Sequence, residues 1–242
     1  MKTGTPAWGP GRHGAAGFAL DLGRCVGCGA CVLACRMENR LPGRVSWRRI
    51  VPLNLARYLG GPTYFFSLAC HHCQDPPCVR GCPSGALRKR PDGVVTLEAD
   101  LCMGCRYCEM ACPFKAPAYD SDAGVMTKCH LCHHRLDSGL LPACVEACPV
   151  GALGFEDDTA AGGDVAAGVD VAAGGAPDAE TRVGRVLRAE EVPGFVDPGE
   201  AKPGLVLVPP VGGIRGAKYV SLESLLAAAA DAASEGEGSG HG

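Results

Sequence analysis

The chain has 242 residues and a formal net charge of −3, with 35 glycines, 19 prolines and 5% aromatic residues. It has no apolar run near the ~18 residues that cross a bilayer, and its first residues lack the apolar segment of a secretory signal. We therefore expect synthesis in the cytoplasm without a membrane span. All 16 cysteines lie between Cys25 and Cys148, and clustered thiols in a reducing compartment indicate metal binding rather than disulfides.

The cysteine-rich part is predicted to be an internal repeat. After an N-terminal arm over residues 1–16, short strands are predicted within residues 17–25, 63–70 and 93–102, and Val125–Met126 is a shorter apolar segment of the same kind. Each leads into a cysteine loop, and short helices are expected afterwards, as in CVLACRMEN and RYCEMAC. Strand, cysteine loop and short helix thus recur four times.

The C-terminal third has a different composition. We predict a four-cluster domain over residues 17–155, a flexible Gly/Ala-rich linker over residues 156–180 and an extension over residues 181–242. The extension is predicted to contain a strand at Leu205–Val208 that docks a partner, and a short helix with Ser221 as its N-cap.

The cysteines fall into four groups, and each group opens with C-x2-C and closes with C-x3-C. The middle gap is two residues in the first and third groups, four in the second and eleven in the fourth. The last three groups end in Cys-Pro, where proline fixes the exit of the chain. The groups are Cys25/Cys28/Cys31/Cys35, Cys70/Cys73/Cys78/Cys82, Cys102/Cys105/Cys108/Cys112 and Cys129/Cys132/Cys144/Cys148.

This spacing favours [4Fe-4S] clusters. Three sulfurs at i, i+3 and i+6 of a loop can converge on one wide body, whereas a zinc ion is usually held by two separate C-x2-C or Cys/His pairs. In bacterial two-cluster ferredoxins the fourth cysteine ligates the other cluster of the pair. Zinc and a disulfide scaffold are the alternatives: the spacing disfavours zinc, and the missing secretion signal disfavours disulfides. Sixteen thiolates at four per cluster make four [4Fe-4S] clusters with none left over.

Nested pairing of the first group with the fourth, and of the second with the third, predicts four metal sites. The fold class expected is α+β: duplicated bacterial-ferredoxin-like modules, rich in loops and held by four [4Fe-4S] clusters. The sites are A (Cys25, Cys28, Cys31, Cys148), B (Cys129, Cys132, Cys144, Cys35), C (Cys70, Cys73, Cys78, Cys112) and D (Cys102, Cys105, Cys108, Cys82).

Charge is also divided. Residues 1–155 hold 17 Lys and Arg against 11 Asp and Glu, a net of +6, and residues 156–242 hold 6 against 15, a net of −9. Four oxidised clusters with their thiolates would bring about −8, which the basic half offsets. Basic residues near the loops are candidates for tuning the reduction potentials: Arg24, Arg36, Arg80, Arg88, Lys89, Arg90, Arg106, Lys115, Lys128 and Arg135.

The histidines near the second and fourth groups are expected to be surface residues or hydrogen-bond donors to ligands: His71, His72, His130, His133 and His134.

The chain contains no Ser/His/Asp arrangement, phosphate-binding loop or nucleotide fingerprint. We therefore expect a protein that carries electrons and has no catalytic residues of its own. A zinc-knuckle protein that binds nucleic acid is the alternative from another class, and no nucleic-acid partner is expected here.

The motifs CVGCGACVLACRMEN, CMGCRYCEMACPFKAP and KCHLCHHRLDSGLLPACVEACPVGAL resemble the iron–sulfur electron-transfer subunits of the dimethyl sulfoxide reductase family of molybdopterin oxidoreductases. The closest likeness is to the B chains of the anaerobic dimethyl sulfoxide reductases. The resemblance covers residues 17–155 and, more weakly, 202–210. It implies a molybdopterin catalytic partner, a quinone-interacting membrane anchor and association with the membrane through these partners.

All four third-group cysteines are present, unlike in nitrate reductase β chains, and a sulfoxide or sulfur-compound reductase is favoured. The iron–sulfur subunit of a hydrogenase or formate dehydrogenase complex is the alternative.

Overall fold

The computed structural model describes residues 17–52, 64–156, 187–188, 201, 203 and 205–208. Its strands form antiparallel pairs that connect one cysteine group to the next. The pairs are β2 (Arg49–Pro52) with β3 (Phe65–Leu68), β4 (Leu87–Lys89) with β5 (Val95–Leu97), and β6 (Ala118–Asp120) with β7 (Val125–Thr127). After the fourth group, β8 (Leu153–Glu156) pairs with β1 (Gly17–Asp21), which precedes the first. The strand after the last cysteine group is thus paired with the strand before the first one.

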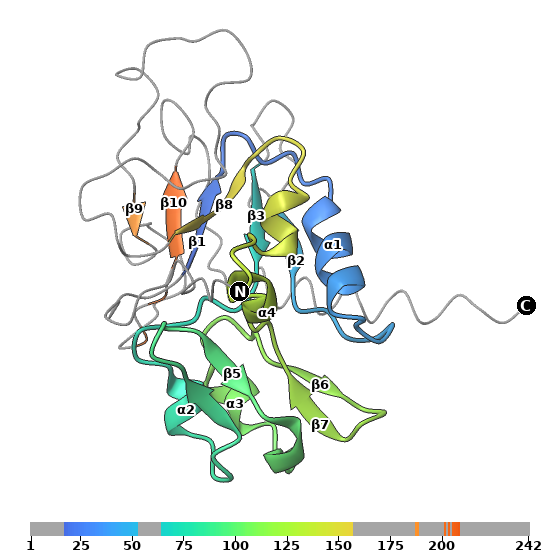
Figure 1. Ribbon diagram of the computed structural model, residues 1–242, viewed down its shortest axis with the longest axis vertical. Coiled ribbons are helices and arrows are strands. Elements are labelled where there is room, and N and C mark those ends of the chain that lie inside the picture. Colours follow the sequence, from blue (N-terminus) through green and yellow to red (C-terminus); the bar gives the residue numbers. More distant parts are fainter. Residues whose placement is uncertain are drawn as a thin grey trace, which may run out of the picture.

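The helices are short and follow or contain cysteines. They are α1 (Ala30–Glu38), α2 (Pro77–Arg80), the 3-10 turn η1 (Ala99–Leu101), α3 (Tyr107–Ala111), α4 (His133–Leu136) and α5 (Ala143–Glu146). Helix α1 contacts α5, and α2 contacts α3. These contacts divide the fold into two halves, with α1, β1, β2, β3 and β8 in one and α2, α3, β5, β6 and β7 in the other (Figure 1). Short strands and short helices agree with the predicted α+β class.

The predicted repeat of strand, cysteine loop and helix is also confirmed. Strands β1, β3 and β7 lie within the segments expected, and α1 and α3 follow their cysteine loops. The third segment is shorter than predicted, because only Val95–Leu97 is a strand and the polypeptide then turns through η1. The predicted arm over residues 1–16, the linker after residue 156 and the helix at Ser221 lie outside the described residues.

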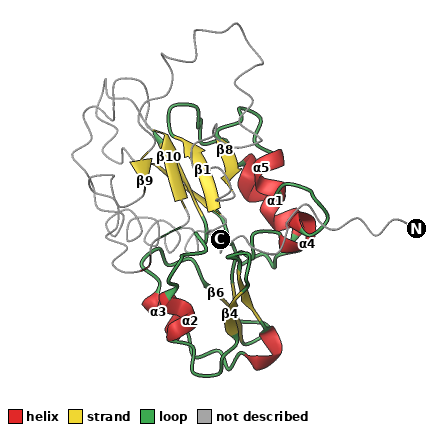
Figure 2. Ribbon diagram, turned by 60° about the vertical axis from the view of Figure 1, so that its left-hand side comes forward, coloured by secondary structure: helices red, strands yellow, loops and turns green. Residues whose placement is uncertain are grey.

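The C-terminal extension adds to the main sheet. This sheet has the order β8-β1-β10-β9 and lies beside α5 and α1 (Figure 2). Strand β10 (Leu205–Val208) runs parallel to β1, with Phe18 opposite Leu205 and Leu20 opposite Leu207, and β9 (Leu187–Arg188) covers its other edge. We expected β10 to dock a partner. In the structure it pairs with β1 along its full length and with β9 at Val206 and Leu207, and the buried side chains of Leu205 and Leu207 join the core beside β1. Docking of a partner by this strand stays a prediction.

The core contains cysteines as well as ordinary apolar residues. Phe18, Phe66, Leu68 and Phe114 are each at most 2% exposed, and they pack with cysteines of sites A, B and C. A smaller cluster joins Leu87, Val95 and Met126 to Cys78 and Cys108. In the described part of the chain, no helix is long and apolar enough to cross a membrane.

The cysteine loops share a backbone feature. The residue just before the second cysteine of each C-x2-C is left-handed, with φ between 46° and 70° at Gly27, His72, Gly104 and Leu131. This conformation is free for glycine and costs other residues roughly 1–2 kcal/mol. Its presence at buried His72 and Leu131 indicates that the loop shape is imposed by its surroundings rather than by local preference alone.

Substituting Gly104 by alanine should disrupt the third loop. Besides its left-handed φ, Gly104 approaches Gly124 so closely that an added Cβ would lie 2.4 Å from that residue's carbonyl oxygen. We expect a lower thermal stability and loss of about a quarter of the bound iron, since one of four predicted clusters depends on this loop. Gly43→Ala is the control because the space around Gly43 is open. Equal iron and stability in the two variants would contradict this account of the loop.

Candidate metal centres

The first and last cysteine groups meet at site A. Burial is the main cause that raises the pKa of Cys25, and a hydrogen bond from the Gly27 backbone opposes it. The neighbouring thiols that raise it further are Cys31, Cys148 and Cys28. The structure therefore brings Cys148 to three cysteines more than a hundred residues earlier in the sequence.

At site B, a cysteine of the first group joins the cysteines of the fourth group. Burial raises the pKa of Cys35 to about 12, Arg48 opposes this rise, and the thiols of Cys144 and Cys132 add to it. The pKa of Cys129 is raised by burial and next by Cys35. Cys35 thus lies among the fourth group's cysteines.

The second and third groups exchange cysteines in the same way. Burial raises the pKa of Cys73, and the thiols that add to it are Cys70, Cys112 and Cys78 of site C. At site D, burial raises the pKa of Cys108 to about 11, with further contributions from Cys102, Cys105 and Cys82. The structure brings together each of the four sets predicted by nesting.

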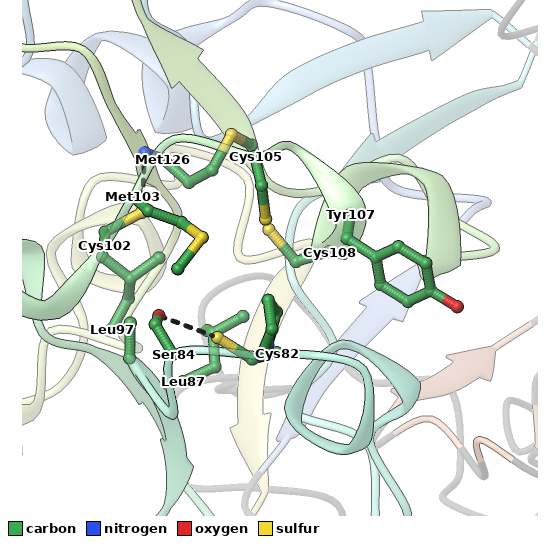
Figure 3. A pocket seen from close by; sticks show the side chains of 12 residues that line it. Cys82, Ser84, Leu87, Leu97, Cys102, Met103, Cys105, Tyr107, Cys108 and Met126 are labelled. Atoms are coloured by element: carbon green, nitrogen blue, oxygen red, sulfur yellow. Dashed lines mark hydrogen bonds between the residues drawn. The ribbon is translucent and has the colours of Figure 1, made fainter.

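Site D surrounds a cavity. All four of its cysteines line this space, and the other lining residues include Ser84, Met103, Tyr107 and Met126. Figure 3 shows the four sulfur atoms around the common space, with Cys82 coming from a different segment than the other three. Among the described residues, no group of three or more His, Cys, Asp or Glu side chains is placed to hold a single metal ion. Four cysteine sulfurs around one space are the ligand set of a [4Fe-4S] cluster.

The sites follow one another in the order A, B, C, D. The thiol of Cys31 in site A acts on the pKa of Cys144 in site B. Cys70 of site C acts on Cys129 of site B, and Cys108 of site D acts on Cys78 of site C. Because such interactions fall off with distance, these pairs identify which sites are neighbours.

Burial differs along this order. All eight cysteines of sites B and C are buried, whereas sites A and D each contain one buried, two half-buried and one exposed cysteine. The exposed ones are Cys28 and Cys105. The two middle sites are thus shielded from solvent, and the two terminal sites reach the surface.

Hydrogen bonds to sulfur also fit bound clusters. Backbone N–H groups donate to Cys102 from Met126 at 3.3 Å, to Cys148 from Ala152 at 3.2 Å and to Cys129 from Leu131 at 3.4 Å. Side chains also lie near sulfurs: Asn39 Nδ2 is 3.8 Å from Cys35 Sγ and 3.9 Å from Cys132 Sγ, Ser67 Oγ is 3.4 Å from Cys31 Sγ, and Ser84 Oγ is 3.6 Å from Cys82 Sγ. Donors of this kind stabilise the negative charge of cluster ligands.

Arg48 is the residue that the sequence reasoning missed. It is 1% exposed, and its Nε and Nη2 have no hydrogen-bond partner in the described part of the chain. Burial lowers its pKa, but Cys144, Cys129, Cys31 and Cys35 outweigh burial, and the net shift is upward. A buried guanidinium needs a nearby anion, and a negatively charged cluster meets that need. Since arginines are common beside the loops, no signal in the sequence distinguishes Arg48 from its neighbours.

Among the predicted tuning residues, two lysines bond to backbone carbonyls near the cysteines, and several arginines form ion pairs. Lys128 is 3% exposed and donates to the carbonyls of Val95 and Cys129, and Lys89 donates to those of Cys73 and Gln74. Several others pair with carboxylates nearer the surface: Arg80 with Asp75, Arg90 with Asp92 and Asp137, Arg106 with Glu109, and Arg135 with Glu38 and Glu146.

Two of the five histidines, His71 and His72, are more buried than a surface role requires, whereas the side chains of His133 and His134 are 35% and 47% exposed and lie beside Asp137 and Glu38. Burial lowers the pKa of His71 to about 3, and its ring packs edge-on against Phe114 at 4.5 Å. His72 Nδ1 accepts a hydrogen bond from the Val95 backbone at 2.9 Å, and burial lowers its pKa well below the usual value. Both rings are therefore neutral parts of the core.

Comparison with known proteins agrees with this cysteine arrangement. Two models of the 4Fe-4S dicluster domain match residues 24–87 and 62–158. The B chain of the anaerobic dimethyl sulfoxide reductase from Escherichia coli K12 is 45% identical over 152 residues, which cover 57% of this protein and 72% of that one.

The protein belongs to the dimethyl sulfoxide reductase B-chain family. Other relatives similar to it serve different reactions. The B subunit of tetrathionate reductase from Salmonella typhimurium is 40% identical over 136 residues, covering 55% of this protein and 54% of its own length. The B subunit of sulfite dehydrogenase from Allochromatium vinosum is 38% identical over 162 residues, covering 58% and 68%. The 4Fe-4S domains support iron–sulfur clusters over the zinc alternative.

Cys148→Ser distinguishes nested pairing from pairing within a group. Because Cys148 lies with Cys25, we expect Cys148→Ser and Cys28→Ser to alter the same signal in electron paramagnetic resonance (EPR) spectra of the reduced protein. Cys132→Ser should alter a different one. If Cys148→Ser matched Cys132→Ser instead, the assignment of Cys148 to site A would be wrong.

Proposed function

We propose that this protein is a non-catalytic electron-transfer subunit that relays electrons through four [4Fe-4S] clusters. Sites A, B, C and D would each hold one cluster through the cysteines assigned to them above. The names of the relatives support the electron-transfer role, since all those reported are B chains or B subunits of oxidoreductases. The sixteen cysteines in four compact sets support the number of clusters.

The observation that carries the proposal is the order of the sites together with their burial. Two buried sites lie between two sites that reach the surface. When bound, [4Fe-4S] clusters supply one-electron chemistry at potentials set by charge, hydrogen bonds and solvent. The fold excludes water from the middle sites and leaves the terminal ones accessible. This is the arrangement that a relay between two partners needs.

Large apolar side chains are exposed near both terminal sites. Near site A, Val26 is 59% exposed and Leu33 60%. Near site D, Met103 is 63% exposed and Tyr107 50%, and the Tyr107 ring points away from the sulfurs (Figure 3). Exposed apolar side chains of this size indicate contact with other proteins. We assign one end to a molybdopterin catalytic subunit and the other to a quinone-interacting membrane anchor.

These partners make the complex a quinol-dependent reductase of a sulfoxide or another sulfur compound, associated with the membrane through the anchor. The relatives support this choice over a hydrogenase or formate dehydrogenase complex, because their names refer to dimethyl sulfoxide, tetrathionate and sulfite.

Cys105→Ser should interrupt the relay at one end. Cys105 is the exposed ligand of site D, and its loss should remove or alter that cluster while the other three remain. In the purified complex, we expect quinol-driven turnover to fall at least about tenfold, because the path through site D is broken. Turnover driven by a small reductant that reaches the catalytic subunit directly should be unchanged.

Ser84→Ala provides the control for site D. It removes a hydroxyl 3.6 Å from Cys82 Sγ but no ligand, and it should keep the full iron content and most of the quinol-driven turnover. Full quinol-driven activity in a Cys105→Ser complex that has lost the site D cluster would contradict the relay.

A further inference from the structure

Arg48 and Ser67 form a buried pair between sites A and B. Arg48 precedes β2, and Ser67 lies on β3, which pairs with β2. Arg48 Nη1 donates to Ser67 Oγ at 2.8 Å and to the Ser67 carbonyl at 3.3 Å. Both side chains are buried, at 1% and 4% exposure. Solvent therefore does not screen the charge of the guanidinium.

The direction of the hydrogen bonds follows from the chemistry of the donors. A guanidinium only donates, and Ser67 Oγ must therefore be the acceptor from Arg48. The hydroxyl proton is then free to point to Cys31 Sγ, which lies 3.4 Å away. A cysteine that ligates iron is a thiolate without a proton of its own. The serine consequently donates to this ligand of site A, and its bond is strengthened by the charge behind it.

The rest of the guanidinium is held without a carboxylate. One face stacks on the Phe18 ring, with Cζ 4.3 Å from the ring centroid, and Nε and Nη2 have no hydrogen-bond partner among the described residues. The charged groups that surround it are cysteines of both sites, Cys31 in A and Cys35, Cys129 and Cys144 in B. A buried cation without a counter-charge is strongly destabilising, and anionic clusters on both sides would supply that counter-charge.

We propose that Arg48, acting on site A through Ser67 and on site B directly, sets the reduction potentials of these two clusters and leaves those of sites C and D unchanged. This inference rests on the proposed presence of clusters at A and B. A buried positive charge stabilises the reduced, more negative state of a cluster. Arg48 is therefore a residue that positions charge and is not a ligand. Its charge raises the reduction potentials of the clusters at sites A and B above those that the cysteine ligands alone would give.

The test is a redox titration of the purified complex, followed by EPR, for the wild type, Arg48→Met, Arg48→Lys and Ser67→Ala. We expect Arg48→Met to shift two of the four reduction steps to more negative potentials. Ser67→Ala should shift one of these two by a smaller amount. Arg48→Lys should recover much of the shift because it restores the charge. Iron content is measured on each sample.

Arg49→Gln is the matched control. Arg49 is adjacent in sequence and half-buried, but its guanidinium donates to the carbonyls of Phe114 and Lys115 and lies near Cys112 of site C. It should leave both of the steps that respond to Arg48→Met unchanged.

Each outcome decides a separate question. Unshifted potentials in Arg48→Met with full iron would overturn the inference. If Arg48→Met fails to assemble, Ser67→Ala decides: one shifted step supports the inference, and none overturns it. A wild-type complex without iron–sulfur signals from this protein would instead overturn the proposed function.

Discussion

The structure depends on the exchange of the fourth cysteine between groups that are distant in sequence. Cys148 joins the first loop, Cys35 joins the fourth, and Cys112 and Cys82 cross between the second and third. The buried thiols raise one another's pKa, and they could not be held together as free thiolates without a large electrostatic cost. Bound metal clusters remove that cost. The same bonds that would hold the clusters then connect strands and helices too short to form a stable domain by themselves.

The sequence predicted the four sets because cysteine spacing constrains a loop geometrically, whatever residues lie between the cysteines. It also predicted the strands that lead into the loops. It did not predict the strands that follow them, such as β4 and β6. Their sequences, LRK and AYD, have no apolar run like those that lead into the loops, and the strands form by pairing with a neighbour. The pairing of β10 with β1 was not predicted, for a related reason. An apolar strand signals burial, but only the tertiary structure shows that β1 is its neighbour.

Arg48 and Ser67 could not be recognised from the sequence because their importance comes from position. Arg48, Arg49 and Arg44 are the same residue type within six positions, and only the fold separates a guanidinium among the cysteines of two sites from one bound to backbone carbonyls. The glycines of the loops were visible, but the left-handed conformation at His72 and Leu131 was not. In both cases the surroundings determine a feature for which the residue type gives no signal.

The central claim is that these cysteines bind four [4Fe-4S] clusters and that the protein carries electrons by means of them. Iron and acid-labile sulfide per polypeptide, measured on anaerobically purified protein, test it most directly. The account predicts about sixteen of each, and little or no zinc. About four zinc ions per polypeptide with no labile sulfide, or about half the iron, would contradict it.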